Sequence, residues 1–372
     1  MLDRSVAGSS GDFATVLGTL STVSLQQGQA AMDAISGQNY SGFATAGIGS
    51  SLGFMNVLGQ QMSLARGGSG AGTRTALAQA CDVACDGEPQ GPWSMWGSAL
   101  GVTGSVAGTG NSATLTYNGG GTATGIDYRV NPNLLMGIGL GFASGNQYLG
   151  GFSGRGTTDS YQGSLYASFT QQAFYLDALA GFGFSNNTMT RQIVIPGLQS
   201  RTALGQTTAN QFVGQAEAGY AIGLHTPSRT SVTPFARLQG VSNNQQGFSE
   251  SGASSLSLTV AQQTTSSLRT TLGMDFGGAF DLGWRDRLAL QVRLGWAHEY
   301  ADTSRPVTAS FAGAPGGAFT VFGAAPQRDA AVIGLAANTA IAQNTSIYLR
   351  YDGEIGTGTD NHALSAGIRL TW

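Results

Sequence analysis

Residues 361–372 read N-H-A-L-S-A-G-I-R-L-T-W, and this stretch decides how the rest of the chain is interpreted. Because side chains of a β-strand point alternately to its two faces, the stretch divides into an apolar face and a small or polar face. The apolar face carries Leu364, Ala366, Ile368, Leu370 and Trp372, and the other carries Ala363, Ser365, Gly367, Arg369 and Thr371. Such a strand fits either the edge of a soluble β-sandwich or the wall of a membrane barrel.

The composition favours the barrel. The chain has 372 residues, of which 58 are glycine and only 10% are charged, and its 17 basic residues are all arginine. So few charges would cover a soluble protein of this size poorly. No run of 18 apolar residues is present, which argues against membrane-spanning helices. A mean hydropathy near zero is instead what alternating lipid-facing and lumen-facing residues produce.

Charge and cysteine content restrict the ligands. A net charge of −3 without a basic cluster argues against nucleic acid as a partner. Cys81 and Cys85 are four residues apart, and with no other cysteine and no nearby histidine they cannot complete a zinc site. A local disulfide formed in an oxidising compartment is the favoured interpretation, with two free thiols as the alternative. We therefore predict no cofactor and no metal.

Residues 1–92 differ in texture from the rest of the chain. Apolar residues at helical spacing predict helical structure from Asp12 to Ser36, ended by Gly37, and a second helix over about 41–65. The second segment is uncharged and rich in small residues, so it is weak alone and is expected to need a surrounding wall. An ordinary amphipathic helix on another domain is the alternative. Residues 67–92 read as a linker. Residues 1–10 show no secretory signal, so we expect a piece of a longer precursor.

Residues 93–372 show alternation typical of strands. Twelve strands are predicted, and the connections between them are alternately long and short, as in an outer-membrane barrel with long outer loops and short periplasmic turns. A soluble sandwich has no reason to follow this order. The predicted strands lie near 93–107, 119–130, 133–144, 157–169, 172–186, 209–224, 229–242, 265–282, 286–301, 328–341, 345–355 and 361–372.

The orientation of each strand follows from its charged residues. In residues 288–300 the even positions are mainly apolar and the odd positions include Gln291, Arg293 and Glu299. A register shift of one residue would turn Arg293 to lipid, at a cost of about 2–4 kcal/mol near the midplane. With the apolar face of every strand outward, a nearly balanced set of charges faces the lumen: Asp127, Arg129, Asp177, Glu217, Arg237, Arg269, Asp275, Arg293, Glu299, Arg350, Asp352, Glu354 and Arg369.

Two further patterns concern the wall. The inward face of the third strand consists of Gly137, Gly139 and Gly141, which indicates that another segment passes close to it. Aromatic residues near strand ends fit the interfacial girdles of a membrane barrel: Trp93, Trp96, Tyr128, Phe142, Tyr161, Phe169, Trp284, Trp296 and Tyr351.

These residues resemble the translocator domain of autotransporters, which carry an N-terminal passenger across the outer membrane on the same polypeptide. The most specific matches are residues 247–273, I-Y-L-R-Y-D-G-E-I at 347–355 and A-L-S-A-G-I-R-L-T-W at 363–372. The resemblance implies a twelve-stranded barrel over 93–372 with a helix threaded through its pore, residues 1–92 being the end of the passenger side. It also implies that Leu364, Ile368, Leu370 and Trp372 form the signal read by the barrel assembly machinery.

The resemblance further implies the outer membrane of a Gram-negative bacterium as the location, with a passenger at or beyond the cell surface. The implied partners are outer-membrane lipid, the assembly machinery, periplasmic chaperones and the chain's own passenger, and we expect a monomer. One subgroup of the family cuts itself at an Asn-Asn pair in the luminal helix. No such pair occurs in residues 41–65, so we predict no self-cleavage by that route.

Three other functions were weighed. A hydrolase is disfavoured because His225, His298 and His362 are not predicted to share a cleft with a nucleophilic serine and a carboxylate. A solute pore plugged by the N-terminal helices is an alternative. A barrel whose surface loops act as an adhesin is another, since loops rich in Gly, Ser and Thr can bind many partners.

Overall fold

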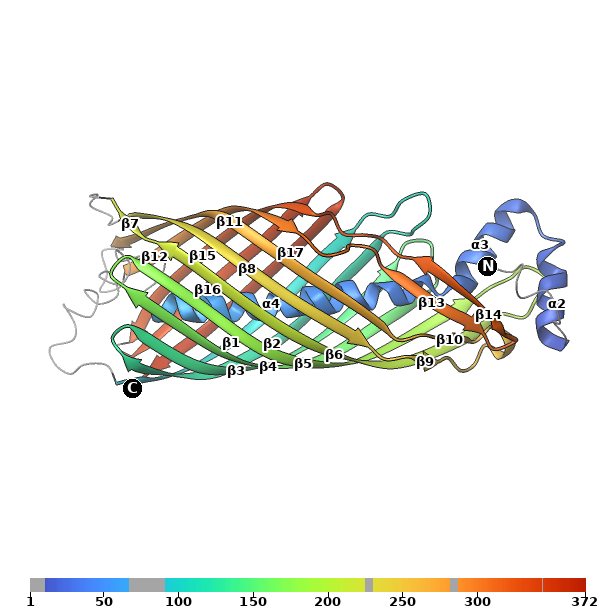
Figure 1. The fold of residues 1–372 in the computed structure, drawn as a ribbon, viewed down its shortest axis with the longest axis horizontal. Coiled ribbons are helices and arrows are strands. Elements are labelled where there is room, and N and C mark those ends of the chain that lie inside the picture. The colour runs from blue at the N-terminus through green and yellow to red at the C-terminus, as the bar shows by residue number, and fades with distance from the viewer. Residues whose placement is uncertain (1–10, 67–90, 225–229, 282–286, 343) are drawn as a thin grey trace.

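The computed structural model of the chain describes residues 11–66, 91–224, 230–281, 287–342 and 344–372. Within these residues, twelve long antiparallel strands form a closed barrel around a helix, which confirms the predicted fold (Figure 1). The barrel strands are β1 (Trp93–Val106), β2 (Leu115–Asn131), β3 (Leu134–Leu149), β4 (Gly154–Gln171), β5 (Phe174–Ile193), β6 (Arg201–Tyr220), β8 (Ser231–Gln245), β11 (Gln263–Asp281), β12 (Arg287–Glu299), β15 (Asp329–Ala342), β16 (Thr345–Gly356) and β17 (Thr359–Thr371).

The barrel closes because the last strand pairs with the first. β17 and β1 are in register from Ser94 opposite Thr371 to Val106 opposite Thr359. Beyond that ladder, the amide of Trp372 donates to the carbonyl of Trp93 at 2.9 Å. The chain end therefore supplies the final seam of the cylinder, and no edge of the barrel sheet is left unpaired there.

The wall has the predicted alternation of faces. In β12, Leu290, Val292 and Leu294 are exposed on the outside, whereas Gln291 and Arg293 are buried inside. The same holds for β17, where Leu364 and Ile368 are exposed and Arg369 is buried. The outer face therefore offers apolar side chains to lipid, and the inner face offers polar side chains to the lumen.

Several strands are longer than predicted. Residues 187–208 were expected to be a loop, but β5 runs to Ile193 and β6 begins at Arg201. Both strands have 20 residues, about twice the 9–11 needed to cross a bilayer, so they extend beyond the membrane. Outside lipid, neither face must be apolar, and the parity signal used to locate strands disappears.

Two other predicted loops also contain structure. The connection 243–264 holds β9 (Phe248–Ser249), the short helix η2 (Ser254–Leu256) and β10 (Leu258–Val260). The connection 302–327 holds the hairpin of β13 (Pro306–Phe311) and β14 (Ala314–Phe322). These strands form a small separate sheet in the order β14-β13-β10-β9. At the opposite end, β7 (Ile222–Gly223) pairs with the start of β8.

The N-terminal part forms helices, as predicted, with one additional break. The helical segment expected from Asp12 to Ser36 is two helices, α2 (Gly11–Leu20) and α3 (Leu25–Ser36). Ser24 starts α3 with a capping box in which its hydroxyl and the Gln27 side chain satisfy each other's backbone amides. Gly37 ends α3 with a φ of 73°, which a glycine adopts without strain.

The chain then enters the barrel. The short helix η1 (Gln38–Ser41) leads into α4 (Gly42–Ala65), which runs along the inside of the barrel in Figure 1. With 24 residues, α4 is about 36 Å long, enough to traverse the lumen. Among the described helices, none is both long enough and apolar enough to cross a bilayer.

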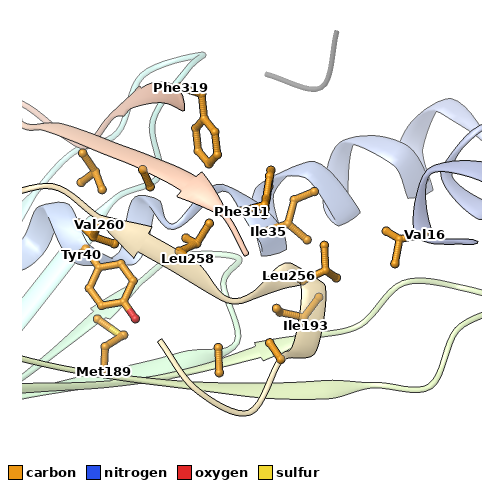
Figure 2. Close-up of a cluster of buried hydrophobic side chains, with 14 of the residues drawn as sticks. Val16, Ile35, Tyr40, Met189, Ile193, Leu256, Leu258, Val260, Phe311 and Phe319 are labelled. Atoms are coloured by element: carbon orange, nitrogen blue, oxygen red, sulfur yellow. The ribbon is translucent and has the colours of Figure 1, made fainter. Parts of the chain in front are cut away.

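A folded unit covers the long-loop end of the barrel. Figure 1 shows α2 and α3 beyond the barrel, next to β13 and β14. Buried apolar side chains from the helices, from the small sheet and from the tips of β5 and β6 form one core, part of which is drawn in Figure 2. We call this unit the outer cap: α2, α3 and η1 together with β9, η2, β10, β13 and β14.

Candidate functional site

The helix α4 and the surrounding wall fit closely. Glycines of β3 allow the approach that the sequence indicated: a Cβ added to Gly139 would lie 2.6 Å from Cδ2 of Leu58. A Cβ added to Gly141 would lie 2.7 Å from the ring of Phe54. Both distances are shorter than normal atomic contacts, so the missing side chains make room for the helix.

Apolar side chains also lie inside the barrel. Leu58 and Met62 of α4 belong to a buried cluster with Trp96, Tyr166 and other wall residues. The prediction that Trp96 belongs to an interfacial girdle is wrong: Trp96 is 1% exposed, and its indole donates to the hydroxyl of Tyr166 at 2.7 Å. Parity places this residue inside, because its neighbour Met95 is exposed on the outside. Position near a strand end was a weaker signal than the alternation of faces.

The charged wall residues neutralise one another. At the centre, Glu217 accepts from Arg237 at 2.5 Å and from Arg293 at 3.0 Å, and Arg293 also donates to Asp275 at 2.7 Å. The hydroxyl of Tyr175 adds a third donor to Glu217 at 2.7 Å. Two guanidinium groups therefore face two carboxylates, with hydrogen bonds in good geometry. We call these four charged residues the central cluster.

The remaining predicted wall charges form smaller groups in the interior. Asp127 pairs with Arg369 and accepts from Tyr166, and Asp352 pairs with Arg350 at 2.5 Å. Arg269 pairs with Glu354 at 2.5 Å, while Glu299 accepts from the amide of Leu268 at 2.8 Å. The two other predicted residues, Arg129 and Asp177, contact the end of α4. Ten of the thirteen residues thus form four ion-paired groups with one another, the central cluster and three pairs, while Glu299, Arg129 and Asp177 have other partners.

Polar contacts tie the wall charges to the helix. Arg237 donates to the side chain of Asn56 at 3.1 Å, and Arg350 donates to Gln60 at 2.7 Å. At the C-terminal end of α4, Arg129 donates to the carbonyl of Ala65 at 2.7 Å. This contact suits the exposed carbonyls and the negative end of a helix. An uncharged helix is therefore held by its amides and its backbone.

Arg66 is a luminal charge that sequence reasoning missed. It follows the last residue of α4, pairs with Asp177 and lies over the ring of Tyr175, 4.0 Å from the ring centre. Only strand residues were considered in the parity argument, so a charge at the helix end was not counted. The available signal was that Arg66 is the first charge after 32 uncharged residues, 34–65.

The helix leaves little free space in the lumen. A cavity of about 100 Å³ lies beside the N-terminal half of α4, where its lining includes Tyr117, Arg269 and Glu299. Another, of about 40 Å³, lies along the glycine-rich part of β2 and β3. Cavities of this size hold a few water molecules. The lumen is therefore occupied by the helix.

The other predicted site residues lie outside the lumen. Leu364, Ile368, Leu370 and Trp372 are exposed on the outer face of the barrel by 37–53%. The candidate disulfide pair, Cys81 and Cys85, lies outside the described residues, as do His225 and Trp284.

Comparison with known proteins places this geometry in a family. The family model described as the autotransporter beta-domain matches residues 95–352. The chain is 25% identical to the esterase EstA of Pseudomonas aeruginosa over 268 residues, 71% of this chain and 39% of that protein. It is 25% identical to an extracellular serine protease of Serratia marcescens over 363 residues, 97% of this chain and 32% of that protein. The chain thus spans less than two fifths of each relative.

Solved structures agree on the fold. The translocator domain of the autotransporter NalP from Neisseria meningitidis superposes with a TM-score of 0.61 at 16% identity, covering 87% of this chain and 98% of that one. The family match extends over most of the barrel and includes residues 247–273, so the resemblance to autotransporter translocator domains is confirmed. The chain therefore belongs to the autotransporter beta-domain family, whose members are outer-membrane translocators of Gram-negative bacteria.

Proposed function

We propose that this barrel exports the chain that precedes it and that α4 is the last segment to remain in the pore. The observation that carries the proposal is the direction of α4. Its first turn adjoins the outer cap, while its last residue contacts Arg129, and Arg66 directly after it contacts Asp177, both beside the short turns. Long loops face the cell exterior and short turns the periplasm in such barrels. The residues that precede α4 in the chain therefore lie on the outer side of the membrane.

The proposal assigns chemistry to the exported segment and not to the barrel. The relatives named as an esterase and a serine protease are much longer than this chain. In the described residues, His298 pairs with Asp329 at 2.8 Å and His362 lies 2.7 Å from the hydroxyl of Tyr351, and neither of these contacts involves a serine. Both groups lie on the outer face of the wall. We therefore infer that the barrel is a monomeric anchor and conduit without catalytic activity.

The partners of the barrel follow from its surfaces. The apolar outer face suits outer-membrane lipid. The exposed side chains of β17, ending at Trp372, suit recognition by the barrel assembly machinery after delivery by periplasmic chaperones. The apolar side chains of β17 point outward and alternate with inward polar ones. The same outward side chains can therefore serve first as the assembly signal and then as part of the lipid-facing wall.

A plugged solute pore is the second candidate, because α4 closes the lumen in either case. Surface display separates the two functions. A secretion signal and an epitope are fused ahead of Asp3, the protein is expressed in a Gram-negative host, and intact cells are treated with protease. Loss of the epitope, with the barrel still folded on unheated gels, is expected for a translocator. An epitope that is protected until the outer membrane is broken would exclude export and support the plugged pore.

A further inference from the structure

The outer cap joins two parts of the chain that lie on opposite sides of the linker. One part is the exit segment, which we define as residues 11–41, containing α2, α3 and η1. The other part consists of the loops that follow β5, β8 and β12. Phe13, Ile35 and Tyr40 of the exit segment are at most 2% exposed, and Leu256 and Phe311 of the loops are at most 1% exposed. All five belong to one buried apolar core, in which Figure 2 labels Ile35, Tyr40, Leu256 and Phe311.

The loops and wall are shaped for the exit segment by missing side chains. A Cβ on Gly205 of β6 would lie 2.1 Å from the hydroxyl of Tyr40. A Cβ on Gly323 would lie 2.0 Å from the hydroxyl of Ser41, and one on Gly313 would lie 2.8 Å from Cβ of Phe13. Each distance is too short for a side chain. Three glycines, one in β6 and one at each end of β14, therefore mark where the exit segment is seated.

A buried ion pair is completed by the exit segment. Arg191 of β5 and Glu250 of the loop after β8 are 2.6 Å apart, and their side chains are at most 1% exposed. Tyr40 donates its hydroxyl to Glu250 at 2.6 Å, and Arg191 donates to the carbonyl of Ala34 at 2.6 Å. Burial beside the Glu250 carboxylate raises the pKa of Tyr40, so its hydroxyl stays a donor. Without the exit segment both charged groups lose a partner.

The loops alone would be a poor final structure. Removing the exit segment would expose the apolar face formed by Leu256, Phe311 and their neighbours, together with an incompletely bonded ion pair. The exit segment alone would also be poorly ordered, because helices of 10 and 12 residues are marginal in water. Each part therefore depends on the other for a closed core, which can form only when both are on the same side of the membrane.

We propose that the outer loops are a docking surface for the chain's own residues 11–41, and that this docking completes export by fixing the exit segment outside. The inference rests on the proposed translocator function, because it needs these residues to arrive through the pore. The docked segment remains on the barrel when the exported chain is cut, so release of a passenger occurs N-terminal to the docked helices.

The test maps how far an external protease can trim the chain. The epitope-tagged full chain is displayed on cells and treated with a protease of broad specificity, and the new N-terminus of the barrel fragment is identified by mass spectrometry. The natural chain is expected to be trimmed no further than Gly11, where α2 begins, because the docked helices are protected. Gly205→Ala is expected to move the boundary to residue 37 or beyond, because its methyl displaces Tyr40.

A matched control lies in the same strand. A Cβ on Gly214 of β6 would lie 3.9 Å from its nearest neighbour, so Gly214→Ala is expected to keep the natural boundary. Ile35→Asp provides a second disruption within the exit segment, outside the barrel wall. It should also move the boundary, while Leu25→Asp, at a position 83% exposed, should not.

The outcomes separate the two proposals. If Gly205→Ala and Ile35→Asp both keep the natural boundary with folded barrels and exposed epitopes, the docking surface is refuted and export stands. If the epitope of the natural chain never reaches the surface, export itself fails. A boundary that moves in both disruptive variants and in neither control supports the docking surface.

Discussion

Replacing Glu217 with glutamine removes one negative charge from the central cluster while keeping the size of the side chain. The cluster then has two guanidinium groups and a single carboxylate. Arg293 keeps Asp275 as a partner at 2.7 Å, but Arg237 keeps only the neutral side chain of Asn56 at 3.1 Å and the new amide. Arg237 then loses its paired carboxylate while its side chain stays buried, with only 9% exposed.

The expected cost is large for a single atom exchange. Removing one partner of a buried ion pair costs about 3–5 kcal/mol. The glutamine oxygen still accepts one hydrogen bond, so we place Glu217→Gln near the lower limit, about 3 kcal/mol. Adding Arg237→Gln removes the uncompensated cation and should recover more than half of that loss. Asp329→Asn serves as the control, since the Asp329 side chain is 60% exposed and such pairs contribute about 0–1 kcal/mol.

The assay is urea unfolding of the purified chain in lipid vesicles, followed by tryptophan fluorescence and by the mobility of unheated protein on gels. The free energy of unfolding is compared for the natural chain, Glu217→Gln, the double variant and the control. If Glu217→Gln unfolds with the natural free energy, or if Arg237→Gln makes it worse, the cluster is not held by the charge balance described above. The reasoning on the luminal wall would then be wrong.

Three further predictions concern the helix, the seam and the cap. Gly141→Ala should destabilise the barrel by about 1–3 kcal/mol through overpacking against Phe54, and Phe54→Ala in the same chain should relieve part of that cost, both measured by urea unfolding. Leu370→Asp should lower the fraction of folded barrel in outer-membrane preparations, since it places a charge on the lipid face. An unchanged fraction would show that Leu370 is needed neither for the lipid-facing wall nor for the assembly signal. Hydrogen bonds from Arg201 and Ser255 hold the pKa of Asp12 below its ordinary value, so its contribution to docking of α2 is complete above that ordinary value and is lost only as the pH falls through the lower one. Protection of α2 from protease should therefore be constant from neutral pH down to about pH 4, and Asp12→Asn should reduce it at every pH in that range.

Alternation was sufficient to predict the membrane part of the barrel. In β12 and β17 each charged residue could be tolerated on one face only, so Arg293 and Arg369 determined the orientation of their strands. Alternation also places Trp96 inside the barrel, whereas its nearness to a strand end predicted, wrongly, a position in the interfacial girdle. The number of strands followed from the count of alternating segments, and the order of long and short connections supported their arrangement as a barrel.

The outer cap could not be predicted by this argument. Arg191 and Glu250 lie 59 residues apart in positions where no lipid limits the choice of side chain, so their pairing had no local signal. Tyr40 and Gly205 likewise depend on one another only through the fold. A cue existed in Phe311 and Phe319, which are apolar residues within a connection that was read as a solvated loop. Apolar residues in a loop at that end of a barrel indicate a partner for the loop.

Arg66, directly after the luminal helix, balances the charges of the barrel wall when the helix is in the pore. The thirteen wall residues comprise six arginines and seven acids, and Arg66 adds the seventh cation when it reaches Asp177. Between residues 34 and 65 the chain carries no charge, so in the proposed export no charged side chain of this stretch would compete with the ion pairs of the wall. The proposed export would end where Arg66 pairs with Asp177 at the inner end and Tyr40 bonds to Glu250 of the Arg191–Glu250 pair at the outer end. Contacts at its two ends, together with the amide contacts of its middle, thus hold α4 in the pore.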